Sequence, residues 1–174
     1  MSTKKKDVEV EADHARWDAV EEAAELLHEE RYHDALLALR EVLQKDPGNA
    51  YGFYFLAIVM YESGELEAAR DAYKACLKIA PSHLGARVAL CHVLRALGDL
   101  RGAIKEGLAA LSQEPGDADA LHAVGLAYYA RGDKEAAKKY LNAFLAAKPE
   151  FEVATEVRAM LASLDESLPT RGDA

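Results

Sequence analysis

Four of the five prolines stand at a constant interval of 34 residues, at Pro47, Pro81, Pro115 and Pro149. A fixed period between 20 and 50 residues is typical of a repeat array. Proline ends a helix and biases the residue before it towards an extended backbone, so each proline marks the same boundary in its repeat. The spacing divides the chain into blocks in register, namely 16–49, 50–83, 84–117 and 118–151.

Other residue types recur in the same register. One position is always alanine, another is always small, and a third is glycine in all blocks but the first: Ala35, Ala69, Ala103 and Ala137; Ala23, Ala57, Cys91 and Gly125; and Glu30, Gly64, Gly98 and Gly132. Small residues let two helices approach closely, and glycine supplies the turn between them. Each block therefore predicts two helices, roughly 16–29 and 32–45, 50–63 and 66–79, 84–97 and 100–112, and 118–131 and 134–147.

The chain resembles the tetratricopeptide repeat (TPR) family, whose repeat has this length. The residues that carry the resemblance are Gly64-Glu65-Leu66-Glu67-Ala68-Ala69…Tyr73…Cys76…Pro81 and Gly125…Tyr128…Gly132-Asp133-Lys134-Glu135-Ala136-Ala137…Pro149. The resemblance implies an all-α protein, a right-handed solenoid of four helix–turn–helix repeats within residues 14–151. It also implies that the first helix of each repeat lines the concave surface.

The two ends of the array have different patterns. Ala154, Val157, Leu161 and Leu164 form an apolar stripe, which predicts a capping helix over 152–164. Residues 1–13 and 165–174 have no apolar period, so we expect disordered tails there.

Composition and motifs exclude several classes of function. A net charge of −9 argues against a nucleic-acid partner. The two cysteines, Cys76 and Cys91, fall on packing positions, where we expect inert core thiols. The near miss to a metal motif, His28 and His33, has a spacing of five instead of four. We therefore expect a non-enzymatic protein without cofactor or metal.

The chain also lacks the patterns of a membrane or secreted protein. Its first residues are polar, and its longest apolar run, 53–61, has nine residues, well below the ~20 that span a bilayer. We expect a cytoplasmic protein that does not insert into membranes.

The repeat register predicts which residues face the groove. Positions 2, 5, 9 and 12 of each block form one stripe on its first helix. That stripe reads Trp17, Val20, Ala24 and Leu27; Tyr51, Tyr54, Ile58 and Tyr61; Gly85, Val88, His92 and Arg95; and Asp119, His122, Leu126 and Tyr129. The candidate binding residues are Tyr51, Tyr54, Ile58, Tyr61, Val88, His92, Arg95, His122, Leu126 and Tyr129.

The stripe predicts a protein or peptide partner with apolar anchors. Residues 51–61 carry no charge, and exposed apolar patches usually mark interfaces. The occupant is an extended or helical apolar segment of another protein, as for a scaffold or adaptor. Alternatively, residues 1–13 or a second copy of the chain cover the patch, as in a homodimer or a self-assembling structural protein, or tight curvature closes the groove.

The groove composition favours some relatives over others. TPR domains that bind the acidic C-termini of heat-shock chaperones present Lys, Arg and Asn at positions 5 and 9, which are absent here. A mostly apolar groove is similar to that of the TPR-type client chaperones of type III secretion translocators, which this chain also resembles in size and acidity.

One residue is much smaller than those at the same position of the other repeats. Gly107 stands where Leu39, Tyr73 and Leu141 supply a large side chain. The sequence predicts thin packing or a shallow pocket in the third repeat.

Overall fold

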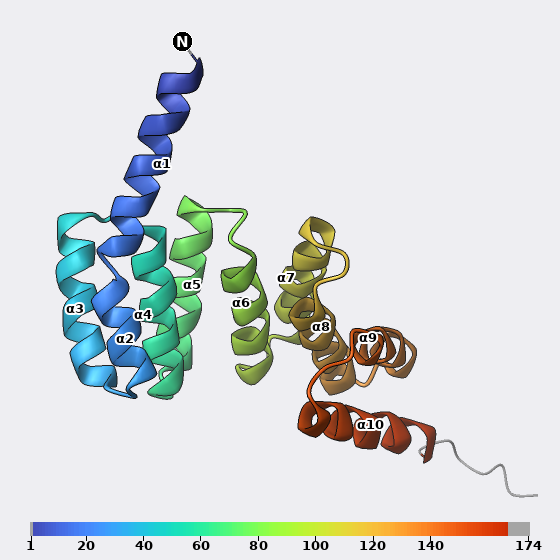
Figure 1. Cartoon of the computed structure of the whole chain (residues 1–174). Helices are drawn as coiled ribbons and strands as arrows, with labels where there is room; N and C mark the ends of the chain where they lie inside the picture. The colour runs from blue at the N-terminus through green and yellow to red at the C-terminus, as the bar shows by residue number, and fades with distance from the viewer. Residues whose placement is uncertain (1, 167–174) are drawn as a thin grey trace, which may run out of the picture.

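The computed structural model describes the backbone of residues 2–166 and the side chains of residues 9–165. Within that range the chain forms α1 (Ser2–Asp18), α2 (Glu21–His28), α3 (Tyr32–Lys45), α4 (Ala50–Glu62), α5 (Leu66–Ile79), α6 (Leu84–Ala96), α7 (Leu100–Gln113), α8 (Ala118–Arg131), α9 (Lys134–Ala146) and α10 (Phe151–Glu166). Helices α2 to α9 stack in sequence as four antiparallel pairs, whose axes turn progressively along the array (Figure 1). The predicted all-helical repeat architecture is confirmed.

From α3 onward, the helix boundaries within the repeats fall within one residue of the predicted places. The residues before the first three periodic prolines, Asp46, Ala80 and Glu114, have φ of −133°, −122° and −135°, outside the helical region. The first helix of the following repeat then begins after an N-cap residue whose side chain accepts a hydrogen bond. Asn49, His83 and Asp117 each accept a hydrogen bond from the backbone N–H three residues on. Such caps satisfy N–H groups that have no partner inside the helix.

Three periodic glycines make the turn inside their pairs. Gly64, Gly98 and Gly132 have φ near +80°, a left-handed conformation that glycine adopts without a steric penalty. Glu30 occupies the same position in the first pair at φ 58°. The first turn is therefore also left-handed, but there the conformation is sterically unfavourable because Glu30 has a side chain.

The small-residue column lies at the centre of each pair. Ala23, Ala57, Cys91 and Gly125 are all buried. A Cβ on Gly125 would lie 2.6 Å from Leu141 Cδ2 and 3.2 Å from the Leu141 backbone nitrogen. The predicted close approach of the two helices is thus confirmed.

Gly107 does not mark thin packing, contrary to the sequence-based hypothesis. It is buried, and an added Cβ would lie 2.4 Å from Val124 Cγ2 and 3.2 Å from Cys91 Sγ. The large side chain is missing because α8 and α6 already fill the space. Burial raises the pKa of the Cys91 thiol to about 12 and that of Cys76 to about 11, consistent with core thiols.

The N-terminal segment also differs from expectation. Residues 2–18 form helix α1, whereas the sequence predicts a disordered tail over 1–13 and a first repeat helix from residue 16. Lys, Glu and Ala favour a helix even without an apolar stripe. The chain bends at Ala19–Val20, so that α2 is short and α1 projects beyond the array (Figure 1).

The C-terminal helix packs on the last repeat. Helix α10 buries Val157 and Leu164, and Val157 packs with Leu141 and Phe144 of α9. It extends one residue before and two residues after the predicted 152–164. The remainder of the predicted tail, 167–174, lies outside the described residues.

Candidate partner-binding groove

A hollow of about 470 Å³ lies over the first helices of the second, third and fourth pairs. Four of the candidate residues line it: Tyr54 of α4, Val88 and His92 of α6, and His122 of α8. Leu84, Gly85, Ala89, Asp117 and Asp119 complete the lining. We call this space the central cavity. A second, smaller hollow of about 150 Å³ is lined by Tyr61 and His92 with Tyr73, Ala89 and Val93.

Three lining residues, Tyr54, His92 and His122, carry aromatic rings, and rings outside the lining pack against two of them. The Tyr54 ring lies 4.6 Å from that of His83, between centroids, and His122 stacks on Phe144 at 4.4 Å. The His92 and His122 rings are 6.3 Å apart. These ring contacts support the aromatic side chains of the lining.

Three imidazoles in or beside this cavity are neutral near pH 7: His92 and His122 line it, and His83 packs on Tyr54 from outside its lining. Burial is the main reason that the pKa values of His83, His92 and His122 are lowered, and the Arg95 charge adds to the effect on His92. The pKa of His92 falls to about 4. The cavity therefore offers an uncharged aromatic floor, bordered by the carboxylates of Asp117 and Asp119.

The other candidate residues do not line this cavity and have different environments. Tyr61 is 41% exposed, whereas Ile58 packs against the core. Leu126 packs with Leu141 and Phe144, and the Tyr129 hydroxyl lies 3.1 Å from Ser163 Oγ of α10. Arg95, in the last turn of α6, has a buried Nε without a hydrogen-bond partner.

The first repeat does not extend the groove as its register predicts. Val20 is fully buried because the bend between α1 and α2 turns it into the core. Trp17 remains 47% exposed and packs edge-on against Tyr51, with 5.3 Å between ring centroids.

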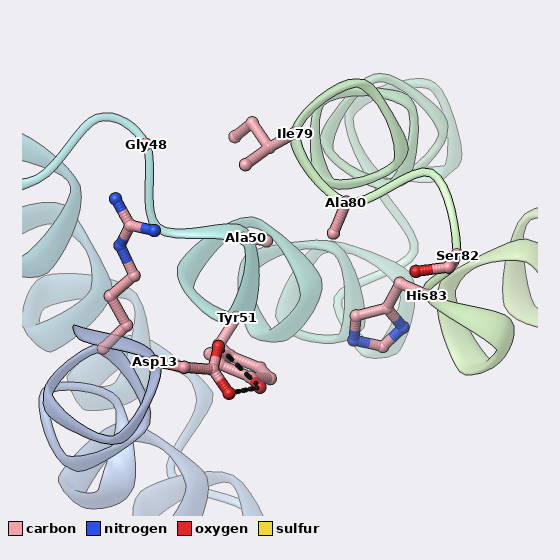
Figure 2. Close-up of a pocket in the computed structure, with 9 residues that line it drawn as sticks. Asp13, Gly48, Ala50, Tyr51, Ile79, Ala80, Ser82 and His83 are labelled. Carbon is pink, nitrogen blue, oxygen red and sulfur yellow. Dashed lines mark hydrogen bonds between the residues drawn. The ribbon is translucent and has the colours of Figure 1, made fainter. Parts of the chain in front are cut away.

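Tyr51 lies in a different hollow from Tyr54. Its hydroxyl donates to the carboxylate of Asp13 at 3.1–3.2 Å (Figure 2). This third hollow, about 340 Å³, is formed by the end of α1 and the two inter-repeat loops, with Arg16, Ile79, Ser82 and His83 among its lining. Asp13 belongs to residues 1–13, which the sequence leaves open as one alternative cover of the groove, and its carboxylate contacts Tyr51 in this hollow.

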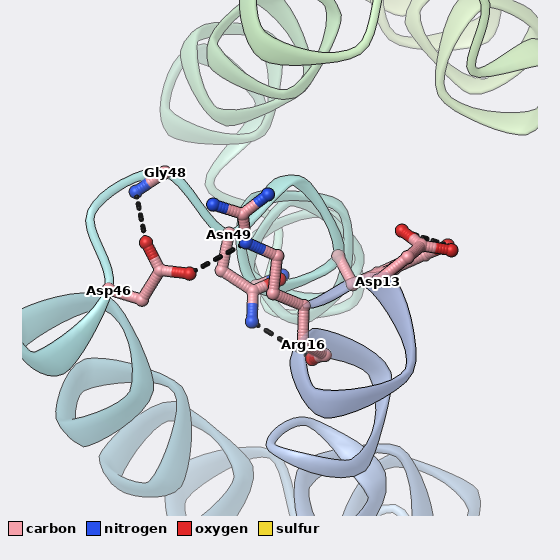
Figure 3. Close-up of polar contacts among 7 residues, drawn as sticks. Asp13, Arg16, Asp46, Gly48 and Asn49 are labelled. Carbon is pink, nitrogen blue, oxygen red and sulfur yellow. Dashed lines mark hydrogen bonds and ion pairs between the residues drawn. The ribbon is translucent and has the colours of Figure 1, made fainter. Parts of the chain in front are cut away.

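A polar network holds α1 against the first inter-repeat loop (Figure 3). Arg16 Nε donates to Asp46 Oδ2 at 2.8 Å, and the Asn49 side-chain amide donates to the Arg16 carbonyl at 2.9 Å. Asp46 also accepts from the Gly48 backbone N–H at 2.9 Å. The hydrogen bond from Arg16 holds the pKa of the Asp46 carboxyl below its usual range.

Sequence reasoning missed some of the lining residues. His83, in the hollow beside Tyr51, and Asp117, in the central cavity, are not at the four groove positions. Both occupy the repeat position of the N-cap Asn49. The preference of N-caps for Asn and Asp was the available signal. The docking of Asp13 and Arg16 had no such signal, because it depends on where α1 bends.

The stacked helix pairs and the groove on their first helices define a tetratricopeptide repeat protein. The family model of the cytochrome c-type biogenesis protein H TPR domain matches residues 4–151. The chain belongs to this family. No curated protein sequence matched it significantly.

Solved structures share the fold at low sequence identity. Pseudomonas aeruginosa PilF has a TM-score of 0.76 at 21% identity, over 87% of this chain and 68% of that one. The type IV pilus biogenesis factor PilW has a TM-score of 0.73 at 19% identity, over 88% and 79%. The first TPR of Spaghetti, solved with the HSP90 peptide SRMEEVD, has a TM-score of 0.61 at 20% identity, over 67% and 93%.

The described residues contain neither a helix that could span a membrane nor a cluster of metal-ligating side chains. No helix there is long and apolar enough to cross a membrane. No group of three or more His, Cys, Asp or Glu side chains in that part of the chain is arranged to hold a metal ion.

Proposed function

We propose that this chain is a non-enzymatic protein-interaction module that holds an apolar segment of a partner protein in the groove of α4, α6 and α8. The observation that carries the proposal is the central cavity, where Tyr54, Val88, His92 and His122 converge from three successive repeats. Repeat solenoids use such concave surfaces for binding. The peptide-bound Spaghetti structure gives a precedent within the fold.

The chemistry of the cavity supports an apolar anchor. Its floor is aromatic and, because His92 and His122 are neutral, uncharged near pH 7. Rigid tyrosine side chains provide large contact areas at a small entropic cost. The exposed Tyr61 ring extends the surface towards the ends of the first helices.

Site-specific photo-crosslinking tests the proposal. A benzophenone amino acid is placed at Tyr61 or Ala89, which line the cavities, and at Leu37 or Leu108, exposed apolar positions on the second helices α3 and α7. In native lysate we expect the same partner to crosslink at both groove positions and not at the two outer positions. Equal crosslinking at all four would contradict a groove site.

A charge in the groove provides the matched loss-of-function test. Tyr61→Glu should release the partner, because a carboxylate loses its hydration when an apolar segment covers it. Leu37→Glu adds the same charge on α3 and should retain the partner. Light scattering across a concentration series distinguishes the self-assembly alternative, in which the wild type is oligomeric and Tyr61→Glu is monomeric.

A further inference from the structure

Arg95 has no hydrogen-bond or ion-pair partner among the described side chains. Its Nε is buried without a hydrogen-bond partner, and no ion pair among residues 9–165 includes it. Arg87 also has a buried, unpaired Nε, but its Nη1 donates to Glu106 and its Nη2 to the Pro81 carbonyl. A buried charged donor without a partner is costly, so Arg95 has a strong tendency to bind an anion.

Arg95 lies close enough to the central cavity to act on its occupant. It follows His92 by three residues on α6, and its charge contributes to lowering the pKa values of both His92 and His122. At the same repeat position, the neighbouring first helices carry Tyr61 and Tyr129. The guanidinium therefore belongs to the same surface as the aromatic residues.

The opposite edge of the cavity is acidic. Asp117 and Asp119 line it at the start of α8. The residue of α6 at the repeat position of Asp119 is Gly85, ten residues before Arg95. Ten residues correspond to about 15 Å along a helix axis. In repeat position His122 and His92 therefore stand between Asp119 and Arg95, and the charges of both residues act on these two imidazoles.

We infer that the groove takes a partner segment in which an acidic residue stands near an apolar or aromatic one. The carboxylate pairs with Arg95, and the apolar side chain fills the cavity between Tyr54 and His122. Arginine suits this role because its planar guanidinium binds both carboxylate oxygens. Asp117 and Asp119 repel the carboxylate from the other edge and so fix the direction of the segment. This inference rests on the proposed function and specifies its ligand.

Selection from a random-sequence peptide display library tests the inference without knowledge of the natural partner. Peptides selected on the wild type should be enriched in Asp or Glu at a fixed spacing from an apolar residue. Arg95→Gln should lose this enrichment, and in fluorescence anisotropy it should bind the wild-type-selected peptides about tenfold or more weakly. Arg95→Glu should select Lys or Arg in place of the acid.

Arg101→Gln is the matched control. Arg101 is exposed on α7, and its loss should leave both the enrichment and the affinity unchanged. Circular dichroism and thermal unfolding of each variant show whether it remains folded. Because Arg95 has no polar partner within the described residues, its removal leaves none of them unpaired.

Different failures are distinguishable. Wild-type selections without acidic enrichment, or enrichment retained in Arg95→Gln, overturn the inference. If those peptides still lose affinity for Tyr61→Glu, the proposed groove stands without the acidic requirement. If Tyr61→Glu binds them unchanged, the proposed function fails as well. Self-association of the wild type that Arg95→Gln abolishes also overturns the inference, because the occupant is then a second copy.

Discussion

The side-chain amide of Asn49 donates a hydrogen bond to the backbone carbonyl of Arg16 across 33 positions of sequence, at 2.9 Å. The same side chain accepts from the Gly52 backbone N–H at 3.1 Å and so caps α4. Asn49 is fully buried. One side chain therefore both begins the second repeat and fastens α1 to it.

Asn49→Ala should lower the free energy of unfolding by about 2 kcal/mol. It removes an N-cap and leaves the Arg16 carbonyl without its donor. Urea denaturation measures the loss, and hydrogen exchange should show faster exchange of the α1 amides. Asn142→Ala is the control, because Asn142 is exposed and bonds only within α9. A loss no larger than that of Asn142→Ala would refute the double role.

Gly107→Ala should lower the free energy of unfolding by about 1–3 kcal/mol through overpacking. Its new Cβ meets Val124, whereas a Cβ on Gly116 meets nothing within 4 Å. Gly116→Ala should therefore change stability by less than about 0.5 kcal/mol. The double variant Gly107→Ala with Val124→Ala should recover part of the loss. Equal stability of Gly107→Ala and the wild type would argue for the thin packing that the sequence suggests.

The contrast between Gly107 and the periodic prolines shows how far the sequence determines the fold. Proline and turn glycine restrict their own backbone, so their spacing predicts the helix pairs directly. The glycine at position 107 instead reflects how little room a side chain would have there. That room is limited by Val124 and Cys91, whose distance from Gly107 depends on how α6, α7 and α8 pack together. Sequence alone cannot distinguish an empty site from a filled one.

In the candidate site, too, the repeat register predicts part of the arrangement and the packing of the helices determines the rest. Tyr54, Val88, His92 and His122, at repeat positions 5 and 9, line one cavity because adjacent first helices present the same face. Ile58 and Leu126, at the same positions, pack against the core instead. Tyr51 lies outside this cavity because α1 bends and brings Asp13 to its hydroxyl. That bend has no local sequence signal.

Glu30→Gly should raise the free energy of unfolding by about 0.5–1 kcal/mol. Glu30 has a φ of 58°, a left-handed conformation that costs a side chain about this much. Ser63→Gly is the matched control, since Ser63 immediately precedes the left-handed Gly64 and has a φ of −81°. We expect that change to be neutral or destabilising in the same urea titration. Equal effects of the two substitutions would show that backbone strain at Glu30 is negligible.

The stability of the array should fall between pH 6.5 and about 4 because of His92. Its pKa is about 4 in the folded chain, against an ordinary value of 6.5. As pH falls, the unfolded chain therefore takes up the proton first, and folding opposes protonation. The stabilisation is complete above pH 6.5 and is lost as pH falls towards 4, by at most about 1.4 kcal/mol per pH unit from this residue.

Urea titrations of wild type and His92→Asn across this range isolate the contribution of the imidazole. Protonation of carboxylates affects both proteins alike, so the difference between the two curves reports on position 92. We expect the difference to narrow as pH falls, because only the wild type loses the neutral imidazole. Parallel curves for the wild type and His92→Asn would mean that burial in the groove floor does not hold this imidazole neutral.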